Sequence, residues 1–205
     1  MKILLTAFEP FGGETVNPAQ EAAALVKNEI AGAEIVKISV PVVFWKSIET
    51  VLRAMEKERP DAVLCLGQAG GRAGLTPERV AINLDDASIP DNAGNRPVDQ
   101  PIFPDGPAAY FSTLPVKAMV SAIRQAGVPA SVSNSAGAYV CNHLMYGVLY
   151  HIARSFPAMR GGFMHVPYLH EQVLTRPGTP SLSREDMVKG IEAALKAIAE
   201  QGILF

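Results

Sequence analysis

Short runs of apolar residues alternate along this chain with segments in which apolar residues recur every three or four positions. The runs predict buried strands at 2–7, 35–40, 62–66, 79–84, 130–133 and 162–166. The recurring pattern predicts helices at 18–30, 45–55, 116–125, 141–154 and 183–198. Strands without a polar side need cover on both faces of their sheet. The order therefore predicts an α/β fold, a three-layer α/β/α sandwich with a mostly parallel twisted sheet.

Local signals add detail to this pattern. Asn17 before Pro18 fits the N-cap of the first helix, and Ser183 fits the N-cap of the last. The stretch 85–115 is rich in proline and has no clear periodicity. A loop of this length inside a compact domain is typically functional or part of an interface, and both a lid and a subunit contact fit the pattern.

Composition and charge narrow the class of protein. The chain has 205 residues, 48% of them hydrophobic, which indicates a single domain over 1–205 with a sizeable core. Its net charge of −2 and the lack of a basic run make nucleic acid and anionic membrane poor partners. The chain turns acidic and glycine-rich at 9–13, too early for a signal peptide, so we expect a cytoplasmic protein. With so large a core, both cysteines are expected to be free thiols.

Cys141 is the first candidate for chemistry, because it follows the Ser/Gly-rich turn 133–137 and opens a helical pattern. The unpaired N–H groups and the dipole at a helix N-terminus favour a thiolate, which makes this a suitable place for a nucleophile. A buried structural cysteine fits the position equally well. Cys65 lies inside a strand pattern and is expected in the core.

A thiol nucleophile needs a base, and His165 is the best-placed histidine because it ends an apolar strand. Ligands of open α/β sheets gather at the carboxyl ends of strands. His143 is two positions from Cys141, so on a helix it should point away from the thiol. Glu78 could orient the histidine, although a Glu-Arg pair at the start of a strand is usually a solvated surface feature.

Acidic residues in the loop raise the question of a metal. Their spacing matches no EF-hand, and no His-Glu-x-x-His pattern occurs, so we expect no metal. The acidic residues considered are Asp85, Asp86, Asp91, Asp99 and Asp105. The glycine-rich segments 11–13 and 67–74 lack the spacing of phosphate-binding loops and are interpreted as backbone turns.

Five segments together resemble the pyroglutamyl peptidase I family of cysteine peptidases, also called pyrrolidone-carboxylate peptidases. They occur in order along most of the chain. The segments are TAFEPFGG at 6–13, GQAGG at 67–71 leading to PERVAIN at 77–83, IPDNAGN at 89–95, SAGAYVCNH at 135–143 and GGFMHVP at 161–167.

The resemblance implies an activity and a set of residues. It implies a catalytic triad of Cys141, His165 and Glu78, no cofactor, a cytoplasmic location and a homo-oligomer, tetramer or dimer. The substrate would be a peptide whose N-terminal residue is pyroglutamate (5-oxoproline). The residues that correspond to the family's apolar pocket are Phe8, Phe11, Ile89, Tyr139 and Val140, with Gln68 and Asn17 near its polar edge.

Tyr139 departs from the phenylalanine common in the family, which would bring a hydroxyl near the pocket wall. We expect an exopeptidase that releases pyroglutamate through a thioester. Two alternatives stay open at this point. One is an amidase acting on another small cyclic amide, and the other is an α/β binding protein that keeps the pocket without turnover.

Overall fold

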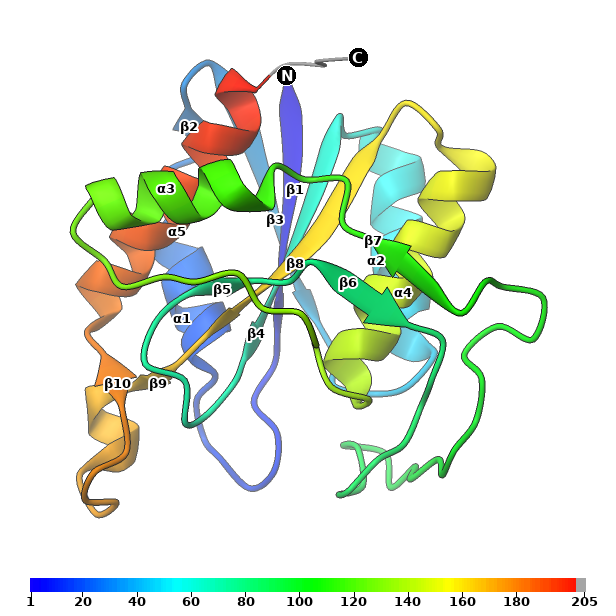
Figure 1. Ribbon diagram of the computed structural model, residues 1–205, viewed down its shortest axis with the longest axis horizontal. Helices are drawn as coiled ribbons and strands as arrows, with labels where there is room; N and C mark the ends of the chain where they lie inside the picture. Colours follow the sequence, from blue (N-terminus) through cyan, green and yellow to red (C-terminus); the bar gives the residue numbers. More distant parts are fainter. Residues whose placement is uncertain (202–205) are drawn as a thin grey trace.

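A six-stranded sheet of order β2-β3-β1-β4-β8-β5 forms the centre of the computed structural model, which describes residues 1–201 (Figure 1). Its strands are β1 (Lys2–Phe8), β2 (Glu29–Ile30), β3 (Ala33–Val40), β4 (Ala62–Gln68), β5 (Thr76–Pro77) and β8 (Arg160–Val166). The four long strands run parallel, and the short β2 and β5 are antiparallel at the two edges. The central strands are buried on both sides, as a sheet covered on both faces requires.

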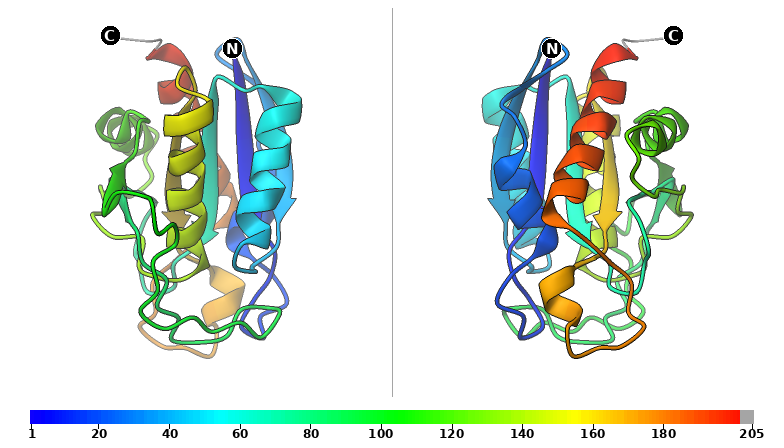
Figure 2. Two further views of the ribbon diagram at one scale, coloured as in Figure 1. Left: turned by 90° about the vertical axis from the view of Figure 1, so that its right-hand side faces the viewer. Right: turned by 90° about the vertical axis from the view of Figure 1, so that its left-hand side faces the viewer.

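Helices cover both faces of this sheet, as Figure 2 shows. Alternate residues of β1 divide between two apolar cores: Ile3 and Leu5 face one, whereas Leu4 and Phe8 face the other. The first core is closed by α1 (Pro18–Leu25), α3 (Val116–Gln125) and α5 (Arg184–Glu200), and the second by α2 (Lys46–Glu58) and α4 (Val140–Ser155). The three-layer α/β/α sandwich is therefore confirmed.

Smaller elements flank the sheet. They are the antiparallel pair β6 (Val80–Ile82) and β7 (Ala109–Phe111), the parallel pair β9 (Tyr168–Leu169) and β10 (Ser181–Leu182), and the 3-10 turn η1 (His170–Val173). None of the helices described in 1–201 is long and apolar enough to cross a membrane.

Two predicted elements differ from the structure. The helix expected at 18–30 ends at Leu25, whose side chain is 59% exposed, and the chain then forms the hairpin of β2 and β3. Ala31 and Gly32 both have positive φ, as a two-residue type I′ hairpin turn requires. The strand expected at 130–133 is reduced to isolated bridges, such as the one between Leu75 and Ala130.

The proline-rich stretch 85–115 lies against α4 and is held there by side chains of that helix. The hydroxyl of Tyr146 donates to the carbonyl of Pro107 at 2.6 Å, and the hydroxyl of Tyr150 donates to the carboxylate of Asp105 at 3.0 Å. Just before the stretch, the amide of Asn142 donates to the carbonyl of Leu84 at 3.0 Å. The helix that opens with Cys141 therefore also fixes the position of this loop.

Candidate active site

Strand pairing places Glu78 beside His165. In β5, Thr76 stands opposite His165 of β8, and the backbone N–H of Glu78 donates to the carbonyl of Phe163 at 2.8 Å. Alternate residues of a strand share a face, so Thr76, Glu78 and His165 lie on one side of the sheet. Nδ1 of His165 is 2.7 Å from Oε1 of Glu78, and the two residues are only 3% and 0% exposed.

Cys141 reaches the same face from α4. Gly67 of β4 pairs in register with His165, and a β-carbon added at Gly67 would lie 3.0 Å from Sγ of Cys141. Paired residues on neighbouring strands hold their β-carbons about 5 Å apart on one face. The thiol, the imidazole and the carboxylate therefore lie on one face of the sheet, near the ends of β4 and β8.

Arg72 joins the group from the loop between β4 and β5, and sequence reasoning had missed it. Its Nη1 donates to Oε1 of Glu78 at 2.6 Å and to the hydroxyl of Thr76, and its Nη2 donates to the carbonyl of Ser135 at 3.2 Å. Nothing in the sequence distinguishes this arginine from a surface residue. The glutamate is ionised in spite of its burial, because bonds with His165 and Arg72 keep its pKa below the ordinary value.

The electrostatics of the site favour a neutral thiol. Burial and the negative charge of Glu78 raise the pKa of Cys141 to about 12, although the charge of Arg72 acts in the opposite direction. Burial also lowers the pKa of His165, and the bond with Glu78 offsets part of this effect. The thiolate expected from the helix N-terminus alone is therefore opposed by desolvation.

Three of the predicted pocket residues lie at or near Tyr139, two positions before Cys141. The ring of Tyr139 lies 6.2 Å from that of Phe11, and its hydroxyl donates to the carbonyl of Pro90 at 3.0 Å. This bond holds the neighbouring Ile89, whose side chain is 43% exposed. Burial, together with nearby negative charge, raises the pKa of Tyr139 to about 12, so its hydroxyl stays protonated.

The other predicted pocket residues pack in the core or form hydrogen bonds within the protein. Their contact with substrate stays a prediction. Phe8 and Val140 are buried in the core on the α4 side. Asn17 caps α1, since its oxygen accepts from the N–H of Ala19 and its amide donates to the carbonyl of Glu9. Gln68 is partly exposed at the end of β4 and accepts a bond from Gln172 at 3.2 Å.

Phe44 and Asp91 contact the predicted pocket residues or their neighbours, and the sequence had not identified either one in this role. Phe44 meets the ring of Tyr139 edge-on at 5.6 Å. Asp91 accepts from the N–H groups of Phe44, Ala93 and Asn95, which organises the segment after Ile89. The Asp-Asn-x-Gly sequence at 91–94 is a turn signal that could have revealed Asp91. Within 1–201, no three metal-binding side chains come together.

Hydrolysis through a thiol is the chemistry that this fold and site define, and the class is that of the cysteine hydrolases. The family model described as pyroglutamyl peptidase matches residues 1–201. The chain belongs to the pyroglutamyl peptidase family.

Individual relatives cover nearly the whole chain. Pyrrolidone-carboxylate peptidase 1 of Streptococcus pneumoniae serotype 4 is 60% identical over 98% of this chain and 94% of its own length. The enzyme of Streptococcus pyogenes serotype M4 is 60% identical over 98% of this chain and 93% of its own. The crystal structure of Bacillus amyloliquefaciens pyroglutamyl peptidase I matches with a TM-score of 0.93 and 50% identity, over 98% of this chain and 97% of that one. An E192D mutant of the pyrrolidone carboxyl peptidase of Pyrococcus furiosus matches with a TM-score of 0.93 and 41% identity, over 98% of this chain and 99% of that one.

Proposed function

We propose that this chain removes N-terminal pyroglutamate from peptides, with Cys141 as nucleophile, His165 as general base and Glu78 as the carboxylate that orients the imidazole. One observation carries the proposal: the thiol lies on the same face of the sheet as a buried His165–Glu78 pair joined at 2.7 Å. Membership of the family across the whole chain supports this activity over the amidase and the inactive binding protein.

The first step transfers a proton as the bond to substrate forms. Because the carboxylate of Glu78 accepts from Nδ1, the imidazole carries its hydrogen on Nδ1 and leaves Nε2 free as the base. Nε2 removes the proton from the neutral thiol while Sγ of Cys141 attacks the exocyclic carbonyl carbon of the pyroglutamyl residue, which belongs to the scissile peptide bond. Ionised Glu78 then stabilises the imidazolium that results.

The start of α4 is suited to the negative oxygen of the tetrahedral intermediate. The first N–H groups of a helix have no partner within it, and the N-cap residue Tyr139 offers them no side-chain bond. The backbone N–H of Cys141 is one of these groups and would donate to this oxygen. Protonated His165 next gives its proton to the departing amine, and the same imidazole activates the water that hydrolyses the thioester.

The rings of Phe11 and Tyr139, which we call the pocket wall, account for selection of the substrate. The nitrogen of pyroglutamate is closed into a neutral lactam, whereas an ordinary N-terminus carries an ammonium group. A pocket bounded by Phe11 and Tyr139 can accept the lactam and imposes a desolvation cost on the charged amine. The side chain of Gln68 would form hydrogen bonds with the N–H and C=O of the lactam. An analogue without these groups would leave the side chain of Gln68 without a partner.

The resemblance to the family also supports a cytoplasmic enzyme that forms a homo-oligomer, tetramer or dimer. Light scattering of the purified protein at micromolar concentration measures its mass directly. A monomer mass at working concentration would contradict this part of the proposal.

The activity is tested with fluorogenic amine conjugates of pyroglutamate, proline and glutamine. We expect the wild-type chain to cleave the pyroglutamyl conjugate selectively, and the Cys141→Ser variant to lose activity by about four orders of magnitude while circular dichroism stays unchanged. Cys65→Ala is the matched control, because Cys65 is a buried core thiol, and it should keep activity. Equal cleavage of the prolyl conjugate, or full activity of Cys141→Ser, would overturn the proposal.

A further inference from the structure

The backbone at Trp45, just before α2, has a strained conformation. Its φ of 62° and ψ of −46° lie in a region that residues other than glycine rarely adopt. The N–H of Lys46 donates to the carbonyl of Phe44 at 2.7 Å, which closes the rare positive-φ form of the γ-turn. Such strain persists only where the surrounding structure holds it, and it concentrates at functional sites.

Two buried side chains from distant parts of the chain hold this turn. The N–H of Trp45 donates to Nε2 of His143 at 2.8 Å, and Nδ1 of the same imidazole lies 2.8 Å from Oδ2 of Asp85. Because Nε2 accepts a bond, the hydrogen of neutral His143 is on Nδ1, which donates to Asp85. His143 is 0% exposed and Asp85 4% exposed, so neither can exchange its partner for water without opening the structure.

The turn directs the ring of Phe44 against the ring of Tyr139 in the pocket wall. Phe44 packs edge-on against Tyr139 at 5.6 Å and against His143 at 5.2 Å, both near 90°. Asp85 is also close in space to the segment that contains Tyr139, because the N–H of its neighbour Asp86 donates to the carbonyl of Ala138 at 2.9 Å. The same imidazole therefore connects the γ-turn, the loop that follows Asp85 and the residues that lead into Cys141.

We propose that His143 and Asp85 are positioning residues for the pyroglutamyl pocket. They hold the γ-turn at Trp45, and the turn holds Phe44 against Tyr139, so that the wall is set before substrate arrives. The inference rests on the proposed function, since it concerns the same pocket. Neither residue takes part in proton transfer, and their loss should weaken substrate binding more than the chemical step.

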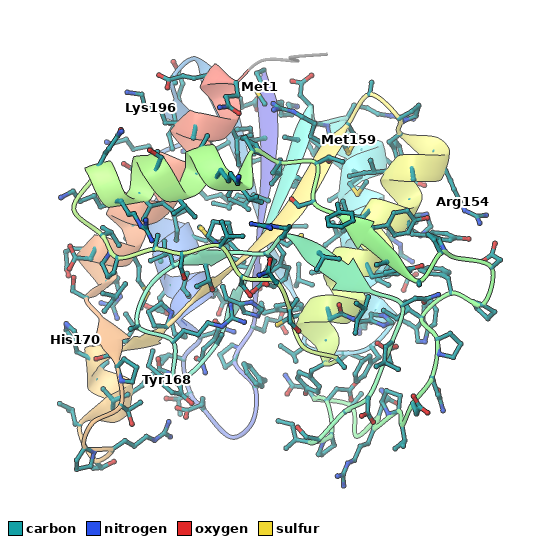
Figure 3. The ribbon with its side chains drawn as sticks, in the orientation of Figure 1. Met1, Arg154, Met159, Tyr168, His170 and Lys196 are labelled. Atoms are coloured by element: carbon teal, nitrogen blue, oxygen red, sulfur yellow. The ribbon has the colours of Figure 1, made fainter. Side chains whose placement is uncertain are left out.

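The chain contains a single tryptophan, whose ring packs edge-on against His143 at 5.1 Å and against Phe103 at 5.3 Å, so its fluorescence reports on the turn and on these two contacts. His143→Asn keeps a donor near Nδ1 for Asp85 and removes the acceptor for Trp45, whereas His143→Gln can place an amide oxygen near the former Nε2. The matched control is His170→Asn, because His170 is exposed and lies at the opposite end of the molecule from α4 (Figure 3).

We expect His143→Asn to raise KM for the pyroglutamyl conjugate roughly tenfold, as the loss of one buried hydrogen bond allows, with kcat changed less than about threefold. Its tryptophan emission should shift, alkylation of Cys141 should stay at the wild-type rate, and His143→Gln should recover part of the KM. His170→Asn should match the wild type in every measurement.

Phe44→Leu provides a second variant in case His143→Asn does not fold. It keeps the backbone bonds of the turn and removes the ring, so KM should rise while the emission of Trp45 stays near that of the wild type. An active wild type with unchanged KM in folded His143→Asn, or in Phe44→Leu, would overturn the positioning role alone. A wild type that does not cleave the pyroglutamyl conjugate would instead overturn the proposed function.

Discussion

Arg72 donates to Oε1 of Glu78 at 2.6 Å, the same oxygen that lies 2.7 Å from Nδ1 of His165. The fully buried carboxylate thus contacts both a cation and the imidazole of His165. A buried charge is tolerated only when it is paired, so Arg72 allows Glu78 to remain ionised next to His165. The positive charge of Arg72 also acts on the histidine and lowers its pKa.

Replacement of this cation should change the pH profile. In Arg72→Met, we expect the acid limb of kcat/KM to move to higher pH, because a positive charge that lowers the pKa of His165 has been removed. The melting temperature should also fall, since Glu78 loses a partner. Steady-state rates between about pH 5 and 9 provide the measurement.

Arg79→Met is the control for this change, since Arg79 is next to Glu78 in sequence but forms no ion pair with it among residues 1–201. An acid limb that stays in place in Arg72→Met, or moves equally in Arg79→Met, would contradict the role assigned to Arg72.

The imidazole should matter more than the carboxylate that orients it. We expect His165→Ala to lower kcat by about four orders of magnitude, because the base itself is lost. Glu78→Gln should cost less, about two orders of magnitude or more, because an amide oxygen can still accept from Nδ1 although the charge that stabilises imidazolium is gone. Rates with the pyroglutamyl conjugate decide the order. If Glu78→Gln equals the parent, the carboxylate has only a structural role.

The rate at which Cys141 is alkylated should rise with pH as expected for a thiol of high pKa. Burial raises that pKa to about 12, so the thiolate fraction, and with it the rate of alkylation by iodoacetamide, should increase about tenfold per pH unit from about pH 6 to 9. Mass spectrometry of the Cys65→Ala variant isolates the reaction of Cys141. A rate that levels off below about pH 8 would show a thiolate–imidazolium pair at rest instead of two neutral groups.

The hydroxyl of Tyr139 should contribute to binding through the loop. Its bond to the carbonyl of Pro90 holds the segment that contains Ile89. Loss of one such bond costs about 0.5–1.5 kcal/mol, so Tyr139→Phe should raise KM about two- to tenfold with kcat largely kept. Tyr110→Phe, in β7 and away from this bond, should leave KM unchanged. The same KM in both variants would mean that the hydroxyl does not hold the loop.

Periodicity was most successful where a segment spans the core. The apolar runs that became β1, β4 and β8 and the stripe that became α5 were predicted within a few residues, because each buries a continuous apolar surface. The helix at 18–30 was overextended, since Ile30 continues its apolar pattern but pairs with Ala33 across a hairpin. Propensity alone does not distinguish these outcomes.

The sequence by itself determined the layered α/β architecture and the family, because apolar periodicity and local motifs depend on neighbouring positions. The triad of Cys141, His165 and Glu78 is what the resemblance to that family implies, and it stays a prediction. Only the tertiary structure decided that Arg72 shares the oxygen of Glu78, that burial raises the pKa of the Cys141 thiol, and that His143 accepts a bond from the N–H of Trp45. Each of these depends on which distant side chains meet in a low-dielectric interior, and one-dimensional spacing does not contain that information.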